Sequence, residues 1–514
     1  MSFDPDTAAS QLRDFLSTQV SVLVMEHDEV LLRLEPGDAC GYSIQAEPRR
    51  LIVHWWSPER NLVRRVESIE ARPPRLRLMA RRLGQTQLTP LWLAPGSQLA
   101  PRTRERQEFR RRLLGKLRQC WPEWEPITGD SPVHGAPWQH LALRRGQQHL
   151  LCLALSPDEP STLCEQALTH LLLWQDEWRR RHPRALPPKT RLLLPAGGAR
   201  AAALRREGLR AERRPEIYWL DDACSPQIAE PLPLSALASG IARAPAPAWE
   251  PPAEALQLFS RLRALCPAAQ LTRGAFGGAS FRLHGLEFLR PARAEERAHA
   301  AFVFGYGREF SPLNETNWPL FEAWLRELAS LRRPGGSASS IWYAAQPEAW
   351  LEESLRGQLP ALAPDWDTQR LYSQVSLNAA EDAMRLDLLF CHRDGRLGIA
   401  EFKTGEDLHF ALQALDYWLR VRQQQLGGEL FRQGYFADRE ISNLPPRLYL
   451  IAPALYRHPK LEALLAAFAP EIPVEQWLLN ADWRERAQVL ERRKDDAISD
   501  EIGSAPLSLE SSRP

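Results

Sequence analysis

Apolar residues follow two different spacings along the chain, and the changes in spacing divide it into segments. Residues 1–97 hold one short helical stretch followed by strand-like apolar runs, which predicts a β-rich amino-terminal domain. An α/β pattern covers residues 98–241 and opens with an arginine-rich helix at 102–121. Proline and alanine dominate residues 242–255, so we predict a linker there.

Three further segments follow the linker. Residues 256–340 alternate strand-like runs with a helical stretch, which predicts an accessory α+β segment. Its last part, residues 332–340, has the glycine and serine content of a flexible junction. Residues 341–490 return to an α/β pattern, and the polar residues 491–514 predict a disordered tail. The pattern as a whole indicates an α/β fold in which mixed sheets are flanked by helices.

The candidate chemistry lies in residues 341–490. Asp387 falls in one apolar strand, a short polar turn follows, and Glu401 and Lys403 fall in the next strand. Because strand residues two apart point to the same face, Glu401 and Lys403 project together, and a hairpin partner brings Asp387 beside them. Two carboxylates and an ammonium group at a sheet edge suit a hard divalent cation and a water to be activated. This pattern predicts a nuclease centre.

Lysine is scarce in this chain, which gives Lys403 added weight. Only five of the 65 basic residues are lysines, and all the others are arginines. A guanidinium stays protonated and planar, whereas a compact ammonium group fits beside a metal-bound water and its pKa can be tuned. A lysine two positions after a glutamate in an apolar strand therefore indicates a chemical role.

A helix predicted at residues 406–425 follows this strand. Its apolar stripe is expected to pack on the sheet and consists of Leu408, Leu412, Leu415 and Leu419. Gln413, Tyr417 and Arg420 lie on the adjoining stripe, so we expect them to face the sheet end that carries the candidate site. Gln413 would orient a water or contact a phosphate, and Tyr417 would form a hydrogen bond within the site. Alternatively, both residues satisfy polar atoms at a helix–sheet seam.

A second helix is predicted before the first of these strands, with Pro347 in its first turn. Glu352 neighbours the buried stripe of this helix and could reach the metal. Glu348 lies one turn earlier on the same side, and Glu353 is the next candidate. Glutamates are also common on the exposed faces of helices, which is the alternative interpretation for Glu352.

The two α/β segments resemble each other. A shift of 247 positions places residues 166–170 on residues 413–417, without a gap back through the preceding strands. In this alignment Asp387, Glu401 and Lys403 are replaced by His140, Ala154 and Ser156. We interpret the similarity as an internal duplication in which the first copy kept the scaffold and lost the metal ligands. Two unrelated segments with a chance similarity between their helices are the alternative.

Residues 348–420 resemble the PD-(D/E)xK nuclease superfamily. The similarity is to the branch with a glutamate on the first helix, an Asp, a Glu-x-Lys and a Gln-x-x-x-Tyr, which includes RecB-like nucleases and archaeal mismatch- and junction-directed nucleases. Leu386-Asp387 stands where the superfamily name has Pro-Asp, a common variation. The two-part layout also resembles a bacterial family of uncharacterised proteins. The resemblance implies a restriction-endonuclease-like mixed sheet flanked by helices, here duplicated with a degenerate first copy.

The resemblance also implies a set of metal ligands. Asp387, Glu401 and the carbonyl group of Phe402 would hold Mg²⁺ or Mn²⁺. Glu352 would bind a second cation or assist the base.

The remaining site residues have implied roles in handling the water and the phosphate. Lys403 would orient or deprotonate the attacking water, Gln413 would position the water or the phosphate, and Tyr417 would lie in the same site. The implied activity is metal-dependent hydrolysis of phosphodiester bonds in DNA, in repair or in defence. RNA is an open alternative substrate. A catalytically inactive nucleic-acid-binding or scaffold protein with the same fold is the alternative function.

Composition limits the binding partners and the cellular location that we expect. The net charge of +1 gives no global field toward nucleic acid, so any basic DNA-binding surface must be local. The seven cysteines are scattered without Cys-x-x-Cys spacing, which argues against a disulfide framework or a zinc site and suits a reducing cytoplasm. The chain has no phosphate-loop motif and no apolar run of membrane length. We therefore expect a cytoplasmic protein that partners DNA and no membrane, and we leave homo-oligomer formation open.

Overall fold

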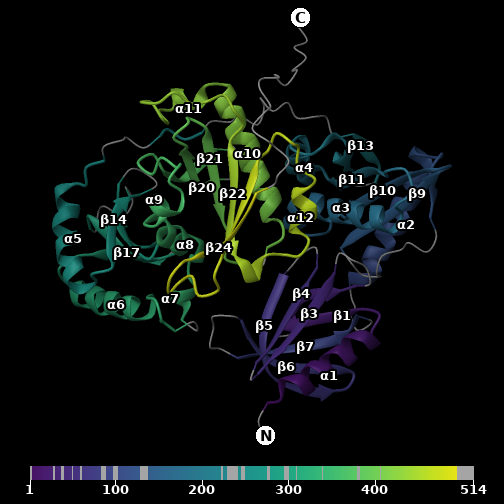
Figure 1. Ribbon diagram of the computed structural model, residues 1–514, viewed down its shortest axis with the longest axis horizontal. Coiled ribbons are helices and arrows are strands. Elements are labelled where there is room, and N and C mark those ends of the chain that lie inside the picture. The colour runs from purple at the N-terminus through teal and green to yellow at the C-terminus, as the bar shows by residue number, and fades with distance from the viewer. Residues whose placement is uncertain are drawn as a thin grey trace, which may run out of the picture.

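Four β-sheets follow one another along the chain in the computed structural model (Figure 1). The structure describes residues 3–494 except 27–28, 36–39, 49, 58–60, 83–87, 97–101, 128–136, 222–223, 229–240, 245–248, 275–277, 294–299, 308, 338–339, 379–382 and 406. We call the four parts the N-terminal unit (residues 3–95), the first mixed-sheet unit (102–228), the accessory unit (253–331) and the second mixed-sheet unit (341–494). Among the described residues, no helix combines the length and apolar character needed to cross a lipid bilayer.

The N-terminal unit is an antiparallel sheet with one helix packed on it, as the alternating apolar pattern predicts. Its strand order is β2-β1-β7-β6-β5-β4-β3. Leu51, Val53 and Trp55 alternate along one strand and are fully buried, so one face of this strand supplies the core. The elements are α1 (Pro5–Thr18), β1 (Val22–Glu26), β2 (Glu29–Leu34), β3 (Gly41–Glu47), β4 (Arg50–Trp56), β5 (Asn61–Arg72), β6 (Arg75–Arg82) and β7 (Thr89–Pro95).

The first mixed-sheet unit has the strand order β13-β12-β11-β10-β9-β8, with β10, β11 and β12 parallel to one another. The predicted basic helix at 102–121 is present as α2, and its apolar residues Phe109, Leu113 and Leu117 are buried. The elements are α2 (Arg102–Cys120), β8 (Glu125–Pro126), β9 (Trp138–Arg145), β10 (Gln148–Leu155), α3 (Ser161–Arg181), β11 (Lys189–Pro195), α4 (Ala199–Glu207), β12 (Glu216–Leu220) and β13 (Pro226–Ile228).

The second mixed-sheet unit has the strand order β19-β20-β21-β22-β23-β24, with β21, β22 and β23 parallel to one another. Pro347 occupies the first turn of α8, as expected from its fixed φ. The elements are α7 (Ile341–Ala344), α8 (Pro347–Arg356), α9 (Leu359–Leu362), β19 (Tyr372–Asn378), β20 (Ala383–Cys391), β21 (Leu397–Phe402), α10 (Phe410–Leu426), α11 (Glu429–Arg432), β22 (Arg447–Pro453), α12 (Leu461–Leu465), β23 (Val474–Leu479) and β24 (Val489–Lys494).

The two mixed sheets have the same topology. Along each sheet, the first two strand pairs are antiparallel, the next two are parallel, and the last is antiparallel. Helix α3 connects β10 to β11 just as α10 connects β21 to β22, and α4 and α12 occupy the next crossover of each unit. Helices α2 and α8 precede the first strand of each sheet.

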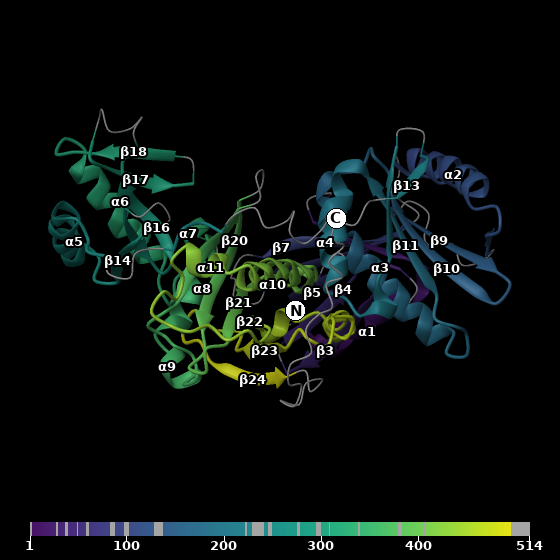
Figure 2. The ribbon, with the colours of Figure 1, turned by 90° about the horizontal axis from the view of Figure 1, so that it is seen from above.

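The helices α3, α4, α10 and α12 lie between the two mixed sheets (Figures 1 and 2). Helix α10 packs against α4, and helix α3 packs against α12. Because α3 corresponds to α10 and α4 to α12, the two contacts are equivalent and each joins one helix from either unit. At its centre Leu209 and Phe468 form an antiparallel bridge. The N–H of Arg210 donates to the carbonyl of Ala467, and the N–H of Ala469 donates to the carbonyl of Gly208, both over 2.9 Å. An antiparallel bridge between corresponding segments has local twofold symmetry.

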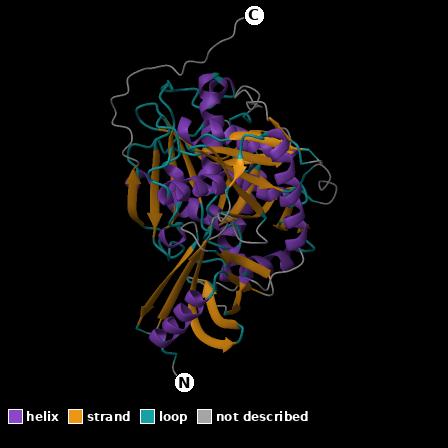
Figure 3. Ribbon diagram, turned by 90° about the vertical axis from the view of Figure 1, so that its right-hand side faces the viewer, coloured by secondary structure: helices purple, strands orange, loops and turns teal. Residues whose placement is uncertain are grey.

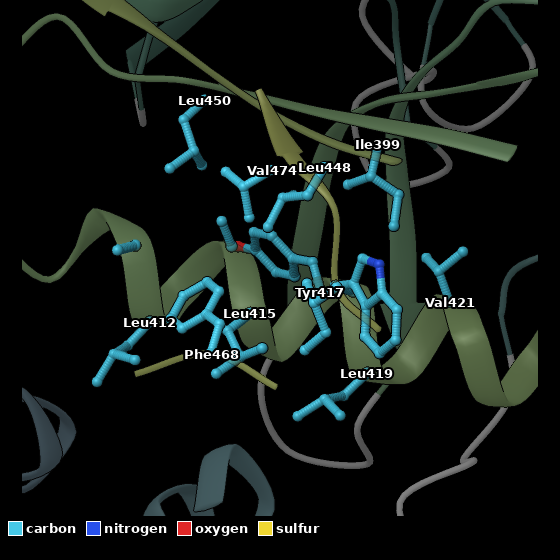
Figure 4. Packing of buried hydrophobic residues seen from close by; sticks show 14 of the residues in the cluster. Ile399, Leu412, Leu415, Tyr417, Leu419, Val421, Leu448, Leu450, Phe468 and Val474 are labelled. Carbon is cyan, nitrogen blue, oxygen red and sulfur yellow. The ribbon is translucent and has the colours of Figure 1, made fainter. Parts of the chain in front are cut away.

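This interface corrects the expected position of the leucine stripe on α10. Gly208 approaches Leu415 so closely that a Cβ at residue 208 would lie 2.5 Å from a Leu415 methyl group. Leu412 and Leu419 point away from the sheet, whereas Tyr417 and Val421 project toward strand residues (Figure 4). All four leucines are buried as predicted, but Leu415 packs on Gly208 of the first unit, and Leu408 precedes α10, which begins at Phe410.

A buried ion cluster joins the same two helices. Asp416 of α10 accepts a hydrogen bond from Arg420 over 2.6 Å and faces Arg205 of α4 at 3.3 Å. The guanidinium of Arg205 also pairs with Glu165 at 2.7 Å. The carboxylate of Asp416 is therefore neutralised from both units, which a buried charge requires.

The accessory unit is an antiparallel sheet covered by two helices, with the strand order β14-β15-β16-β17-β18. It contains the strands and the helical stretch that the sequence predicts for residues 256–340. Its elements are α5 (Ala253–Leu265), β14 (Ala269–Arg273), β15 (Ala279–Leu283), β16 (Leu286–Pro291), β17 (Phe302–Tyr306), β18 (Glu309–Leu313) and α6 (Trp318–Leu331).

The expected flexible junction at 332–340 is anchored instead. Arg332 is fully buried, and its guanidinium donates to the carbonyls of Leu283, His284, Trp342 and Ala345 over 2.5–2.8 Å. These acceptors belong to the accessory unit and to the segment around α7, so one side chain connects the two. Glycine content alone could not reveal this, because the anchor is an arginine at the start of the segment.

The predicted ends of two other segments also need correction. The linker predicted at 242–255 begins on the sheet edge, where the N–H of Ala242 donates to the carbonyl of Ser376 over 3.1 Å. Its last three residues belong to α5, which begins at Ala253, and residues 245–248 lie outside the described part.

The tail predicted from residue 491 begins too early, because β24 continues to Lys494 in a ladder with β23. Residues 495–514 lie outside the described part.

The N-terminal unit contacts the second mixed-sheet unit at the segment after β22. The side-chain amide of Asn61 donates to the carbonyl of Tyr456 over 2.8 Å. The Nδ1 of His458 accepts from the N–H of Lys460, so its Nε2 carries the proton and donates to the carbonyl of Ser57 over 3.0 Å. In Figure 3 this strand-rich unit projects from the rest of the molecule with the N-terminus at its far end.

We predict that Arg332→Met destabilises the protein by about 2–4 kcal/mol, because four buried carbonyls lose a charged donor. Arg333→Met is the matched control, since Arg333 is an exposed neighbour that bonds only local carbonyls. Chemical denaturation of both variants measures the difference. Equal unfolding midpoints would show that Arg332 does not anchor the junction.

Candidate active site

Asp387 and Glu401 lie side by side where β20 and β21 meet. Leu388 pairs with Ala400, and the next step along this antiparallel ladder brings Asp387 opposite Glu401. The N–H of Phe402 donates to Asp387 Oδ2 over 2.9 Å, and a backbone hydrogen bond from Asp387 reaches the carboxylate of Glu401. The predicted hairpin thus brings the two acidic residues together.

Gln374 is a site residue that sequence reasoning missed. It lies in β19 between Ser373 and Val375, which pair with β20, but it drops out of the ladder with a φ of +51°. Its side-chain amide donates to Asp387 Oδ1 over 3.0 Å. A left-handed conformation at a residue other than glycine costs about 1–2 kcal/mol. The unfavourable backbone conformation therefore coincides with the hydrogen bond to Asp387, and no feature of the apolar pattern signals it.

Glu401 is a buried carboxylate with an unused oxygen. The residue is 5% exposed, and its Oε2 has no hydrogen-bond partner among the described residues. Burial raises the pKa of Glu401 well above its usual value, and the charge of Asp387 raises it further. An unpaired buried carboxylate oxygen is unfavourable unless it is protonated or binds a cation.

Asp387 has a similar electrostatic environment. Burial raises its pKa to about 7, against the effect of the hydrogen bond from Phe402. The charges of Glu352 and Glu348 raise the pKa of Asp387 as well. The site therefore concentrates negative charge that only a cation or protons can neutralise.

Lys403 follows Glu401 on the same face of the strand end. Its ammonium group forms an ion pair with Asp407 at 3.0 Å, and both side chains are partly exposed. Burial alone would lower the pKa of Lys403, but Asp407, Glu348 and Glu401 together raise it. Lys403 is therefore an ammonium ion at neutral pH, held at the edge of the carboxylate pair.

The three glutamates of α8 have different surroundings. Glu348 accepts hydrogen bonds from the N–H and hydroxyl of Thr404, directly after Lys403, so it contacts the segment that follows β21. Glu352 accepts from Ser373 over 2.7 Å and pairs with Arg356 at 2.5 Å. Glu353 bonds Gln270 and Gly285 of the accessory unit instead.

Gln413 and Tyr417 bond each other beside the carboxylates. The amide of Gln413 donates to the hydroxyl oxygen of Tyr417 over 3.0 Å. Burial and the nearby charge of Glu401 raise the pKa of Tyr417, so its hydroxyl stays protonated. Tyr417 projects toward the sheet, as expected (Figure 4). Arg420, in contrast, lies in the ion cluster with Asp416.

A pocket opens on the Lys403 side of the strand end. Its lining includes Lys403, Asp407, Phe410, Tyr456, Arg457 and Gln476. The pocket therefore borders Lys403 and the segment contacted by the N-terminal unit, and its lining does not include Asp387 or Glu401.

The residues present fit a hard divalent cation. Within the described part, no group of three His, Cys, Asp or Glu side chains converges as a ready-made metal cage. Mg²⁺ does not need one, because it commonly binds one or two carboxylates and keeps several waters. Asp387 and Glu401 supply the two carboxylates, and the unused Oε2 of Glu401 is a free donor.

The corresponding strand of the first mixed-sheet unit shows that the gapless alignment is wrong there. Ala154, expected in the place of Glu401, belongs to the core on the α2 side, whereas Leu153 and Leu155 pack on the α3 side. Glu401 lies on the α10 side, which corresponds to the α3 side. The reason is the hairpin loop, which has two residues between β9 and β10 and five between β20 and β21. Leucines thus occupy the face that carries the carboxylate in the second unit.

No protein-family model matches this chain. No curated protein matches it either. Among solved structures, it is similar to EndoMS in a complex with double-stranded DNA, at 13% identity over 43% of this chain and 95% of the other, with a TM-score of 0.15. It is also similar to a repair endonuclease from Pyrococcus abyssi, at 10% identity over 45% of this chain and 97% of the other, with a TM-score of 0.16.

A third similar structure is Can2 from Sulfobacillus thermosulfidooxidans in complex with cyclic tetra-adenylate. The identity is 13% over 58% of this chain and 75% of the other, and the TM-score is 0.14. Scores this low do not assign a function.

We predict that Asp387→Asn and Glu401→Gln stabilise the metal-free protein at pH 8. A carboxyl group whose pKa is raised to about 7, as for Asp387, favours folding when protonated, so its contribution is lost as the pH rises through 7. Thermal unfolding in chelator should show a gain at pH 8 that becomes smaller at pH 5.5, because the wild type regains part of its stability as the pH falls from 7 toward the unfolded-state pKa. Each kcal/mol corresponds to about 2–4 °C in a unit of this size.

In the wild type, Mn²⁺ should raise the melting temperature at pH 8 more than at pH 5.5, and both variants should lose this response. Glu315→Gln is the control, because the Glu315 side chain is 90% exposed. An equal Mn²⁺ response in the wild type and the variants would rule out the carboxylate pair as the metal site.

Proposed function

We propose that the chain is a Mg²⁺- or Mn²⁺-dependent nuclease that hydrolyses phosphodiester bonds of DNA. The observation that carries this proposal is the buried, unpartnered Oε2 of Glu401 beside Asp387, with the Lys403 ammonium on the same strand end. Two buried carboxylates that repel each other are costly to keep without a cation. A cation at this position would polarise a phosphoryl oxygen and lower the pKa of a bound water.

Each residue then has a defined task. Asp387 and Glu401 hold the cation together with the Phe402 carbonyl, and Gln374 fixes the orientation of Asp387. Lys403 is an ammonium ion, so it donates hydrogen bonds to the water or phosphate and offsets the charge of the pentacovalent transition state.

The residues of the helices support this centre from both sides. Gln413 and Tyr417 keep the water or phosphate oriented from the α10 side. Glu348 contacts the strand end from α8, and Glu352 supplies a second carboxylate on that side. Glu352 already pairs with Arg356, so its role as a ligand for a second cation requires that pair to open.

The inactive-scaffold alternative would be favoured by an ion pair between Glu401 and Lys403 that closes the site. Lys403 instead pairs with Asp407, and one oxygen of Glu401 has no partner within the described part. The observed pairing thus supports the catalytic proposal.

The first mixed-sheet unit is, in this proposal, a degenerate copy of a restriction-endonuclease-like nuclease unit. Support comes from the shared strand order, the two equivalent helix contacts and the twofold bridge between Leu209 and Phe468. Leu153 and Leu155 fill the face from which a carboxylate is missing. The chain then carries the equivalent of a dimer with one active centre, and the degenerate copy helps to hold the DNA.

We predict metal-dependent cleavage of at least one form among plasmid, linear, single-stranded and forked DNA. Lys403→Ala should lower the rate by about 10²–10³-fold, because the variant loses a charge that acts on the transition state. Lys189→Ala is the matched control, since Lys189 is an exposed lysine at the start of β11 in the first unit. Binding without cleavage by the wild type would favour the scaffold function. Cleavage of RNA alone would change the substrate class.

We also predict that plasmid is converted to nicked circles well before linear DNA accumulates. In this proposal one chain carries a single active carboxylate pair, and the α10 face that a second nuclease unit would occupy is already covered by α4. Gel analysis of a time course, with sedimentation of the protein at the same concentration, makes the test. Linear product formed at once by a monomer would contradict the single-centre proposal.

A further inference from the structure

Arg484 lies in the hairpin between β23 and β24, close to the candidate site. The hairpin is fixed by Asn480, which donates to the carbonyl of Arg486 and accepts from the N–H of Gln488, both over 2.9 Å. Arg484 is therefore presented by an ordered turn of the chain.

Three aromatic rings surround the guanidinium of Arg484. Its Cζ lies 4.3 Å from the ring centre of Trp483, 4.8 Å from that of Tyr343 and 5.5 Å from that of Trp350. Trp350 and Trp483 are almost completely buried. Aromatic faces attract a cation, but they leave its N–H groups without acceptors.

Among the described residues, the guanidinium of Arg484 has no anionic partner. No hydrogen bond or ion pair joins it to any described residue, and its Nε is buried without an acceptor. Arg332, which shares the Trp350 ring, shows the contrast because its N–H groups are saturated by four carbonyls. An arginine has five N–H donors in a planar fork. Only Nε of Arg484 is buried without an acceptor, so its Nη groups are open to solvent and available to a ligand.

Arg484 also lies within electrostatic reach of the site. Burial lowers its pKa, and the nearby Tyr343, Tyr456 and Glu348 act in the opposite direction. Glu348 bonds Thr404 next to Lys403, and Tyr456 lines the pocket that Lys403 borders. The guanidinium therefore stands on the α8 side of the same strand end.

We propose that Arg484 binds a backbone phosphate of the nucleic-acid substrate adjacent to the phosphate that is cut. Planar N–H pairs match phosphate oxygens bidentately, and the aromatic surroundings hold the guanidinium in place before the substrate arrives. The inference rests on the proposed nuclease function and adds a phosphate-binding residue outside the Asp, Glu-x-Lys and Gln-x-x-x-Tyr set.

The test is DNA binding by the full chain at several salt concentrations, with Ca²⁺ replacing Mg²⁺ to prevent cutting. Arg484→Met should weaken binding about tenfold and reduce the slope of log Kd against log salt by about 1, because one phosphate contact is lost. Arg486→Met is the matched control, since Arg486 is exposed in the same hairpin. In Mg²⁺, KM should rise more than kcat falls.

The outcomes separate this inference from the proposed function. Neither binding nor cutting by the wild type would remove the nuclease proposal and this one with it. Normal cutting by the wild type together with an unchanged salt slope in Arg484→Met would overturn only the inference, and a lower melting temperature alone would show a purely structural role.

A second measurement applies if Arg484→Met does not fold. Arg484→Lys keeps the charge and loses the fork, and it is compared with the wild type on DNA that carries one neutral methylphosphonate at successive positions. A position whose neutralisation weakens the wild type several-fold and Arg484→Lys much less identifies the contacted phosphate. Equal losses at every position would overturn the inference.

Discussion

The candidate site depends on two carboxyl groups that are removed from water and lie close enough to repel each other when both are ionised. Asp387 and Glu401 face each other across one step of an antiparallel ladder, and burial raises the pKa of both. Gln374 and the Phe402 N–H donate to Asp387, but no described donor reaches Glu401 Oε2. The fold thus holds two buried carboxyl groups, whose negative charges are only partly compensated, at a fixed position. Uncompensated buried charge of this kind reduces the stability of the free protein, and the same charge favours the binding of a cation.

Holding such a pair in place requires rigid surroundings, and α10 provides them through its two covered faces. Tyr417 and Val421 lie against the sheet, while Leu415 lies against Gly208 of the first unit. One apolar core includes residues of both units, among them Leu172 and Leu204 from the first. The position of Gln413 and Tyr417 relative to Glu401 therefore depends on packing that begins in a different part of the chain. A close-packed interior transmits such constraints because it has little free volume.

The local part of this arrangement could be predicted from sequence. Strand alternation placed Glu401 with Lys403, the hairpin brought Asp387 beside them, and Pro347 marked the start of α8. The long-range part could not be predicted in this way. The leucine stripe of α10 indicated burial but not which surface covers it, since helix periodicity is the same for a sheet and for another helix. Gln374 escaped notice because a single left-handed residue leaves no periodic signal. The gapless alignment gave the wrong register for β10 because it assumed that the two hairpin loops have the same length.

If the first mixed-sheet unit is the degenerate copy proposed above, its packing on the second unit explains why it would be kept. Without α4, the face of α10 that contains Leu415 would be open to water, and the charge of Asp416 would lose Arg205. Loss of a buried carboxylate pair, in contrast, costs a scaffold nothing in packing, because leucines such as Leu153 and Leu155 fill the same face and relieve the repulsion. Packing and chemistry thus place different demands on two units of one topology. The first unit has leucines in place of the buried carboxyl groups and supplies packing, so the second unit can keep the uncompensated carboxyl groups that the proposed reaction uses.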